Sequence, residues 1–329
     1  MRIVVDAMGT DAHPAPDVAG AVQAARALGD EIILVGDESQ IKAELAKHKA
    51  AGLKLEVVHA SEVIEMTDKP AESAKHKSNS SIHVGTQLVA DGKADAFVSA
   101  GNTGGTLAVS TLYTLKRIKG VLRPAVTVVY PLGVKKVVVA DIGANTDCKP
   151  EFLVQFAIMA SLYAELALHV ERPRVALLSN GEEAEKGNIL VKETAALMLT
   201  MTAINYIGNI EPKEVIRGHA DVIIADGFTG NVFIKMYEAT TRFVTDVVRE
   251  EIGASPITLL GGALSRPAFQ RVRKRLDPFE VGGAPLLGVN GVVIIAHGRS
   301  NAFAISNAIT RAKEAVESGL VEAIQAGVA

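Results

Sequence analysis

Aromatic residues are scarce in this sequence of 329 residues: they make up 4% of it, and tryptophan is absent. Proteins that bind nucleic acid by stacking its bases rely on aromatic side chains, so this composition argues against that mode of binding. The net charge of −3 also gives no overall electrostatic attraction for nucleic acid. We therefore expect no nucleic-acid partner.

Cysteine is nearly absent as well. The single cysteine, Cys148, excludes an intramolecular disulfide and a cysteine-rich zinc site. A helix start nearby would lower the pKa of its thiol, but no histidine partner is identifiable in the sequence, which favours a structural role. No set of His, Asp and Glu residues has the spacing of metal ligands. The glycine-rich dinucleotide, P-loop and nucleophile-elbow motifs are also missing, so neither a metal nor a cofactor is expected.

Long hydrophobic runs and a signal peptide are missing too. No run of about 18 uncharged apolar residues occurs, which argues against a membrane-spanning helix. The sequence begins with a strand-like segment at Ile3–Val5 and not with a signal peptide. These two observations lead us to expect a cytoplasmic protein.

What the sequence does contain is a repeated pattern: a short apolar strand, a loop rich in glycine and asparagine, and a helical segment. The predicted strands that end in such loops are Phe97–Ala100, Val137–Ala140, Val175–Leu178, Val222–Ala225 and Val292–Ala296. Alternating strands and helices predict an α/β fold, with a mostly parallel sheet in a three-layer α/β/α sandwich. No linker-like segment divides the chain, so we expect a single domain over residues 1–329.

An asparagine stands in each of these loops. The five are Asn102, Asn145, Asn180, Asn231 and Asn301. Loops at the carboxyl ends of parallel strands line one crevice, and ligands bind there. Any one of these asparagines can be a turn residue, because asparagine tolerates a left-handed backbone. As a set, they provide neutral donors that suit a bound phosphate or a carbonyl that becomes an oxyanion.

The segment His219–Lys235 carries the clearest form of the pattern. Its loop, Asp226–Asn231, contains two glycines, and apolar residues recur at helical spacing from Val232 onward. The free N–H groups in the first turn of a helix, together with its dipole, favour an anion. Lys235 adds a positive charge in that turn, so the segment predicts a site for a small anion.

Three other features each allow two interpretations from the residues alone. Lys186 is either a solvated helix residue or a partner for phosphate or a leaving group. His297 is either a core residue or a proton carrier. The polar, cation-rich segment Glu65–Ser81 is either a solvated loop or a lid or basic wall beside an anion site.

The segment Ile252–Leu276 differs from the rest of the chain because it contains no acidic residue. Apolar residues come first and basic residues follow: Ile257, Leu259, Leu260, Leu264, Arg266, Arg271, Arg273, Lys274 and Arg275. This order suits a membrane surface or an acidic partner protein, and the alternative is a helical hairpin buried at a dimer interface. Ser255-Pro256 and Gly261-Gly262 argue against one straight helix here.

At these same residues the chain resembles a known family, the bacterial phosphate acyltransferases of phospholipid synthesis (PlsX). The matching stretches follow one another along essentially the whole chain: VDAMGTD (5–11), DKPAES (68–73), DAFVSAGNTGG (95–105), DIGANTDCKPE (141–151), SNGEEAEKGN (179–188), ADGFTGNVFIK (225–235) and GGAPLLGVNGVVIIAHGRSN (282–301). Small departures are Thr10, where the family usually has a second glycine, Thr146 in place of a valine, and Val281 in place of a frequent tyrosine. None of them removes an expected reacting group.

The resemblance implies transfer of a long acyl chain from acyl carrier protein to inorganic phosphate, which gives acyl phosphate without a cofactor. It also implies a homodimer whose fold is similar to that of isocitrate and isopropylmalate dehydrogenases, with a protruding helical hairpin around residues 252–276. Loose attachment to the inner face of the membrane, and a downstream glycerol-phosphate acyltransferase as a partner, are further expectations.

On this resemblance, phosphate attacks the thioester directly and no acyl-enzyme forms. Asn231, Gly230 and the Gly101–Thr103 loop would hold phosphate and the carbonyl, Lys186 would neutralise phosphate or the thiolate, and His297 and Asp226 would handle the proton. The residues expected to bind phosphate or substrate are Gly101, Asn102, Thr103, Asn145, Asn180, Asn188, Gly230, Lys235 and Asn301. Those expected to dock the carrier protein or the membrane are Leu259, Leu260, Arg266, Arg271, Arg273 and Lys274.

Three rival functions remain open at this stage. A phosphotransacetylase would use a short acyl-coenzyme A as its donor, and the basic, apolar segment 252–276 favours a protein-borne substrate instead. A hydroxy-acid dehydrogenase would need a metal-binding carboxylate cluster, which the sequence does not show. A membrane-surface scaffold without activity would need segment 252–276 but not Asn231 or Lys186.

Overall fold

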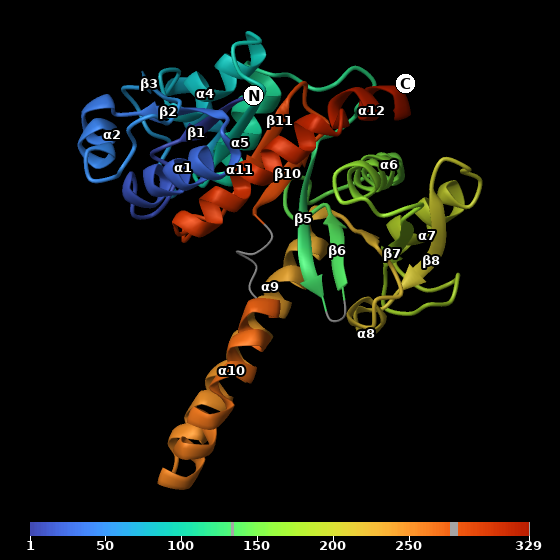
Figure 1. The fold of residues 1–329 in the computed structure, drawn as a ribbon. Coiled ribbons are helices and arrows are strands. Elements are labelled where there is room, and N and C mark those ends of the chain that lie inside the picture. The colour runs from blue at the N-terminus through green and yellow to red at the C-terminus, as the bar shows by residue number, and fades with distance from the viewer. Residues whose placement is uncertain (133–134, 277–281, 329) are drawn as a thin grey trace.

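The chain folds around one eleven-stranded sheet with the strand order β3-β2-β1-β4-β11-β10-β5-β6-β9-β7-β8 (Figure 1). The computed structural model describes residues 1–132, 135–276 and 282–328. The strands are β1 (Arg2–Asp6), β2 (Glu31–Gly36), β3 (Leu55–His59), β4 (Ala96–Ser99), β5 (Ala125–Leu132), β6 (Lys135–Ala140), β7 (Arg174–Leu178), β8 (Asn205–Ile210), β9 (Val222–Ile224), β10 (Ala284–Leu287) and β11 (Val292–Ile295).

Most neighbouring strands in this sheet run parallel. The parallel pairs among the described strands are β1–β2, β2–β3, β1–β4, β4–β11, β6–β9, β7–β9 and β7–β8. The exceptions lie in the middle, where β10 is antiparallel to β11 and to β5, and β5 is antiparallel to β6. The prediction of a mostly parallel sheet is therefore confirmed.

Helices cover both faces of the sheet. They are α1 (Ala15–Leu28), α2 (Glu38–Leu45), α3 (Pro70–His76), α4 (Ser81–Ala90), α5 (Thr103–Ala108), α6 (Pro150–Leu166), α7 (Ile189–Met198), α8 (Pro212–Ile216), α9 (Gly227–Gly253), α10 (Pro256–Leu276), α11 (Ala302–Glu317) and α12 (Leu320–Gly327). A π-helix over Val109–Tyr113 follows α5, where the sequence would suggest a single helix from Thr106 to Arg117.

The core lies on either side of the strands because successive strand residues point to opposite faces. Ile3 and Val5 of β1 pack in one cluster with residues of α1, α6 and α11. Val4 points the other way, into a cluster with α4. In the other half of the sheet, this second face is covered by α8 and α9. The three-layer α/β/α arrangement is confirmed, and the buried α6 is a central core helix.

A long helical hairpin extends away from this body (Figure 1). It is larger than the segment 252–276 predicted from the sequence, because α9 runs without a break from Gly227 to Gly253 and supplies the first arm. The turn falls just before Pro256, as predicted. Gly261-Gly262 does not break α10, however, and the helix passes through both glycines.

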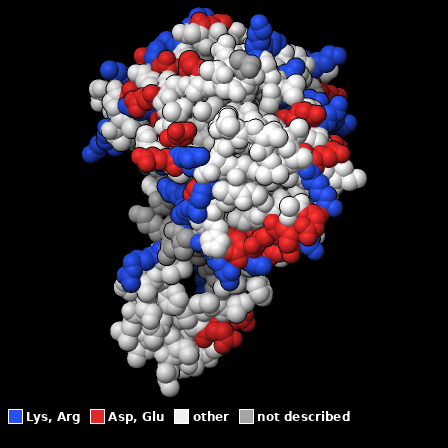
Figure 2. All heavy atoms as spheres, turned by 90° about the vertical axis from the view of Figure 1, so that its right-hand side faces the viewer, with Lys and Arg blue, Asp and Glu red and all other residues white. Residues whose placement is uncertain are grey.

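The apolar stripe of α9 faces solvent over most of its length. Val232, Met236, Phe243 and Val247 lie 52%, 66%, 67% and 40% exposed, so the stripe is not a face packed on the sheet. The apolar residues of α10 are exposed as well: Ile257, Leu259, Leu260 and Leu264. Figure 2 shows the uncharged surface that results on the hairpin. Arg266 and Arg271 are exposed, whereas the side chains of Arg273, Lys274 and Arg275 lie outside the described residues.

No helix in the described part of the chain combines the length and the hydropathy that crossing a bilayer requires.

Candidate functional site

A cavity of about 550 Å³ opens at the middle of the sheet, between the half that runs from β3 to β11 and the half that runs from β6 to β8. Loops after β1, β3, β4, β6 and β11 line it, together with α9, residues of β5 and the start of β10. The strands before these loops flank the antiparallel pair β5–β10 in the middle of the sheet. The loops after β4, β6 and β11 therefore contribute to one cavity, although β6 runs in the direction opposite to β4 and β11.

One part of the cavity carries charge. Lys235 enters from α9, and His297 and Arg299 enter from the loop after β11. Partial burial and the nearby Arg299 both lower the pKa of His297, which favours its neutral form near neutral pH. Glu238 lies one turn beyond Lys235 on α9, and its carboxylate accepts a hydrogen bond of 2.8 Å from the hydroxyl of Tyr130.

The rest of the cavity is apolar. The side chains that line this part are Met66, Leu107, Val126, Val128, Ile142, Ile234 and Ile295. An apolar lining with a few convergent polar groups is typical of a small-molecule site. This one suits a ligand that carries an anionic group at one end and a hydrocarbon group at the other.

Hydrogen bonds to Ser99 and Asp6 fix the glycine-rich loop after β4. The N–H of Gly101 donates to Ser99 Oγ at 3.0 Å, and Ser99 Oγ donates to Asp6 Oδ2 at 2.7 Å. Asp6 is buried, and burial raises the pKa of its carboxyl group. Gly101, Thr103 and Gly104 consequently form a fixed edge of the cavity.

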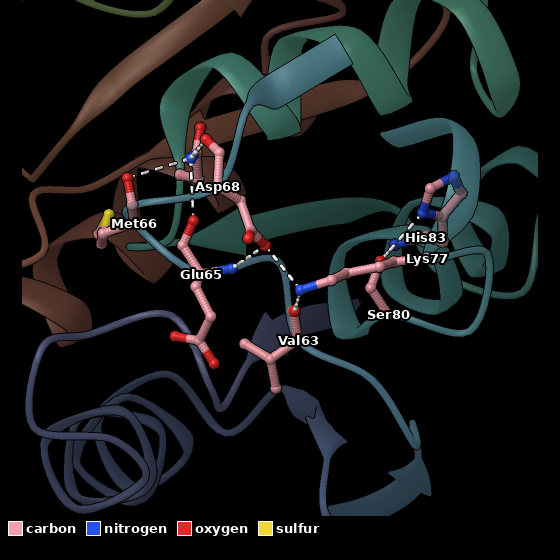
Figure 3. A network of polar contacts seen from close by, with 8 residues as sticks. Val63, Glu65, Met66, Asp68, Lys77, Ser80 and His83 are labelled. Atoms are coloured by element: carbon pink, nitrogen blue, oxygen red, sulfur yellow. Dashed lines mark hydrogen bonds and ion pairs between the residues drawn. The ribbon is translucent and has the colours of Figure 1, made fainter. Parts of the chain in front are cut away.

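Asn102 faces away from the cavity into a network of its own. Its Oδ1 caps α5 by accepting the N–H of Gly105 at 2.9 Å. Its Nδ2 donates to the carbonyl oxygens of Glu65, Met66 and Asp68 at 3.0, 3.4 and 3.3 Å (Figure 3). Both polar atoms of the side chain are hydrogen-bonded within the protein, so Asn102 connects the loop after β4 to the segment before α3.

Contacts with Asp226 and Asp141 fix the start of α9. Asp226 caps the helix: its carboxylate accepts the N–H and the hydroxyl of Thr229 at 2.9 and 2.7 Å. Gly230 packs so closely on the carbonyl of Asp141 that a Cβ would clash with it. In the predicted anion site at the first turn of α9, the N–H groups of Gly227 and Thr229 thus donate to protein oxygens, and the cavity lining includes Asn231 further along the helix.

Asn231 is the predicted asparagine that reaches the cavity. Its Nδ2 donates to the carbonyl oxygen of Ile142 at 2.8 Å, which fixes the side chain on the loop after β6. That loop is organised by Asp141, which accepts the backbone N–H groups of Ala144 and Asn145. Burial raises the pKa of the Asp141 carboxyl group.

The other predicted residues have structural contacts outside the cavity lining. Asn188 and Asn301 cap α7 and α11 by accepting the N–H groups of Val191 and Ala304. Asn180 accepts the N–H of Gly187 at 3.0 Å, and Asn145 donates to the carbonyl of Pro124 at 2.8 Å. Lys186 is exposed in the loop after β7, a strand that β9 separates from the cavity-lining β6.

Cys148 has a structural environment. Burial is the main cause that raises the pKa of its thiol to about 12, and the negative charge of Asp141 adds to it. The lowered pKa that a nearby helix start would give is therefore absent. The described residues also hold no group of three or more His, Cys, Asp or Glu side chains that could bind a metal ion.

Sequence reasoning missed four cavity residues with ionisable side chains: Asp11, Tyr130, Glu238 and Arg299. A signal was available for Glu238, because it lies seven residues after Asn231 and so falls on the same helical face. Arg299 follows two residues after His297, in a stretch already singled out. Nothing in the sequence pattern indicates Tyr130, since it lies inside a strand that reads as core.

Comparisons with known proteins agree over almost the whole chain. A family model described as "Fatty acid synthesis protein" matches residues 1–323. A phosphate acyltransferase of Herpetosiphon aurantiacus is 46% identical over 356 residues, which cover 98% of this chain and 96% of that protein. A phosphate acyltransferase of Geobacter sulfurreducens is 47% identical over 320 residues, 97% of this chain and 92% of the relative.

Solved structures share the fold at low sequence identity. The EutD phosphotransacetylase from Staphylococcus aureus superimposes with a TM-score of 0.61 at 18% identity, over 96% of this chain and 94% of that one. A protein from Salmonella typhimurium described as a 4-hydroxythreonine-4-phosphate dehydrogenase gives a TM-score of 0.53 at 13% identity, over 95% and 99%. The fold thus occurs in both acyltransferases and dehydrogenases, as the sequence resemblance implied. The identity and coverage of the relatives assign the family: the chain belongs to the phosphate acyltransferases (the PlsX family of fatty acid synthesis proteins), and it is an acyltransferase.

Proposed function

We propose that the cavity transfers a long-chain acyl group from acyl carrier protein to inorganic phosphate, by direct attack of phosphate on the thioester. One observation carries the proposal: a single cavity places Lys235, His297 and Arg299 beside an apolar lining. Phosphate requires the cations, and the acyl chain requires the apolar surface.

The reaction needs three contributions from the protein. Lys235 and Arg299 hold and partly neutralise phosphate, which is otherwise repelled by the developing negative charge. Asn231, one helical turn before Lys235 on α9, and the Gly101–Gly104 turn stabilise the carbonyl oxygen as it becomes an oxyanion. A phosphate oxygen forms the new bond to the carbonyl carbon while neutral His297 takes the proton of the attacking hydrogen phosphate. The carbon–sulfur bond then breaks, and His297 gives this proton to the departing thiolate. The proposal does not include Lys186, because it lies outside the cavity lining.

The hairpin is proposed to bring the donor and the membrane to this site. Arg266 and Arg271 would attract the acidic carrier protein, and Leu259 and Leu260 would contact the inner face of the membrane. The exposed apolar stripe of α9 would pack against a second copy of the chain in a homodimer. A downstream glycerol-phosphate acyltransferase would then receive the acyl phosphate at the membrane.

The reaction is tested by measuring free thiol released from hexadecanoyl–acyl carrier protein, with and without phosphate and with no added metal or nucleotide. Release should saturate with phosphate, and hydroxylamine should trap the product as a hydroxamate. Hexadecanoyl-coenzyme A, used as the alternative donor, tests the phosphotransacetylase-type reaction. No release from either donor by the folded protein would favour the scaffold function.

Docking is tested by charge reversal. Arg271→Glu together with Arg266→Glu should raise the KM for the carrier-protein donor, more at low than at high salt because screening weakens exposed charges. Lys192→Glu, on the exposed surface of α7, is the matched control. An unchanged KM at low salt would remove these arginines from the docking surface.

A further inference from the structure

Residues 63–68 bring the side chain of Met66 into the lining of the cavity, and we call them the wall segment. They lie between β3 and α3 and adopt no helix or strand. The side chain of Met66 lines the cavity, and its Cε lies 2.7 Å from the position that a Cβ on Gly298 would take. Met66 therefore reaches across to the loop after β11 and contributes to this side of the cavity, with 45% of the residue exposed.

The wall segment has no hydrogen bonds of a helix or a sheet, so side chains fix its position. Asn102 and Lys77 provide most of these side-chain contacts. Asn102 binds three carbonyl groups of the segment from the side of α5. From the other side, Lys77 Nζ donates to the carbonyl oxygen of Val63 at 2.7 Å and to Asp68 Oδ2 at 2.6 Å (Figure 3).

Lys77 contacts both ends of the wall segment, Val63 and Asp68. Asp68 Oδ2 also accepts the N–H of Glu65 at 2.9 Å, so the ammonium group, the carboxylate and the backbone form one connected unit. The Lys77 side chain is 31% exposed and that of Asp68 is 25% exposed, so the pair is largely shielded from solvent. Lys77 keeps the pKa of the Asp68 carboxyl group below its ordinary value, and the ion pair persists at neutral pH.

We propose that Lys77 is a positioning residue of this enzyme: through Val63 and Asp68 it fixes the wall segment, and thereby Met66, against the substrate. The proposal rests on the proposed function, since it assigns the wall to the acyl donor. Lys77 lines no part of the cavity, so its effect on the reaction passes through Met66. The sequence allowed segment Glu65–Ser81 to be either a solvated loop or a lid or basic wall. The proposal corresponds to a wall, but the lysines of the segment are not among the residues that line the cavity.

The first test compares two lysines in similar ion pairs. Lys77→Met keeps the length of the side chain and removes its donors. Lys313→Met is the matched control, because Lys313 Nζ also lies 2.6 Å from an aspartate, Asp30, with side-chain exposures of 23% and 11%. Lys77→Met should lower kcat/KM for hexadecanoyl–acyl carrier protein by about 10- to 100-fold, the range expected when a binding group shifts by about 1 Å. Lys313→Met should leave kcat/KM unchanged.

A role in general stability would not alter the choice among acyl chains, so selectivity is the second readout. Met66→Ala should change the ratio of kcat/KM for hexadecanoyl to decanoyl donors by about 10-fold, which is typical for a changed hydrophobic contact. Lys77→Met should change the ratio in the same direction, and Lys77→Arg should return it to the wild-type value. Cleavage after Glu65 by a glutamate-specific protease should be faster in Lys77→Met than in the wild type.

The outcomes separate the two proposals. If the wild type releases no thiol, the proposed function fails, whatever the protease shows. If the wild type is active while Lys77→Met has the kcat/KM and the chain-length ratio of the wild type, the function stands and the role of Lys77 is refuted. Faster cleavage after Glu65 without any kinetic change refutes it equally, because the wall would then be loosened without consequence for the substrate.

Discussion

Replacing Gly230 with alanine distinguishes packing from phosphate binding at the start of α9. An ideal Cβ at this position would lie well under 3.0 Å from the carbonyl oxygen of Asp141 and 3.1 Å from its carbonyl carbon. Backbone atoms of a buried strand end cannot rotate away, so the whole helix start must shift. Overpacking of this kind costs about 3 kcal/mol, at the upper end of the usual range. The better helix propensity of alanine offsets about 1 kcal/mol, which leaves a loss of about 2 kcal/mol.

The same shift should reach the cavity. Asn231 and Lys235 follow Gly230 on α9, and a displacement of about 1 Å can lower turnover by about 10²-fold. Urea denaturation measures the loss of stability, and phosphate-dependent thiol release measures the loss of turnover. Gly261→Ala is the control, because nothing lies within 4 Å of its Cβ position in α10. It should increase stability slightly, by up to about 1 kcal/mol, and leave turnover unchanged.

The two explanations of Gly230 predict different results for the same variant. If Gly230→Ala unfolds at the urea concentration of the wild type and only its KM for phosphate rises, the residue contacts phosphate and the packing argument is wrong. If stability and kcat fall together, position 230 requires glycine because the carbonyl group of Asp141 leaves no room for a Cβ.

Three further predictions concern single side chains. Asn231→Ala should lower kcat by about 10²–10³-fold, whereas Asn188→Ala should cost about 1 kcal/mol in urea denaturation and leave kcat unchanged; equal kinetic effects would contradict the difference in their positions. Arg299→Met should raise the pKa of His297, so the limb of the pH–rate profile that reports this histidine should move to higher pH; a shift to lower pH would refute the assignment. Burial raises the pKa of Asp17 to about 8, so its unfolded form ionises first and stability should fall from about pH 4 to pH 8. Asp17→Asn should flatten that part of the stability profile measured by urea denaturation.

The strands were predictable because they are buried on both faces. Val137–Ala140 and Val292–Ala296 are unbroken runs of β-branched or small apolar residues. A strand that is buried on both faces has no alternating polar residues, so such a run identifies it. The exposure of the hairpin was harder to predict from the sequence. Phe243 and Val247 recur at the spacing of a packed helical face, and that spacing is the same whether the face meets the sheet or solvent.

The asparagines show where sequence reasoning about the site reached its limit. Asn188 and Asn301 each stand directly before a helix, and a helix cap needs the same side-chain oxygen in the same position as a ligand site does. The residue type is therefore equally favoured by both roles. Asn231 differs because it lies inside the first turn of α9, past the capping position that Asp226 holds, and so its side chain is directed along the helix toward the cavity.

Strand order explains both the position of the cavity and the exclusion of Lys186 from its lining. β10 and β5 run opposite to each other: the amino end of β10 lies beside the carboxyl end of β11, where Ala284 pairs with Ile295, and the amino end of β5 lies beside the carboxyl end of β6, where Thr127 pairs with Ala140. A strand and not a helix follows each of them in the chain, and the gap between the flanking loops forms the cavity. Arg299 lines this cavity from the loop after β11, and Lys235 lines it from α9. The loop carrying Lys186 has the same composition as the others, but two strands separate it from β5 and the gap. Composition identifies such loops, and only the pairing of distant strands decides which of them share a cavity.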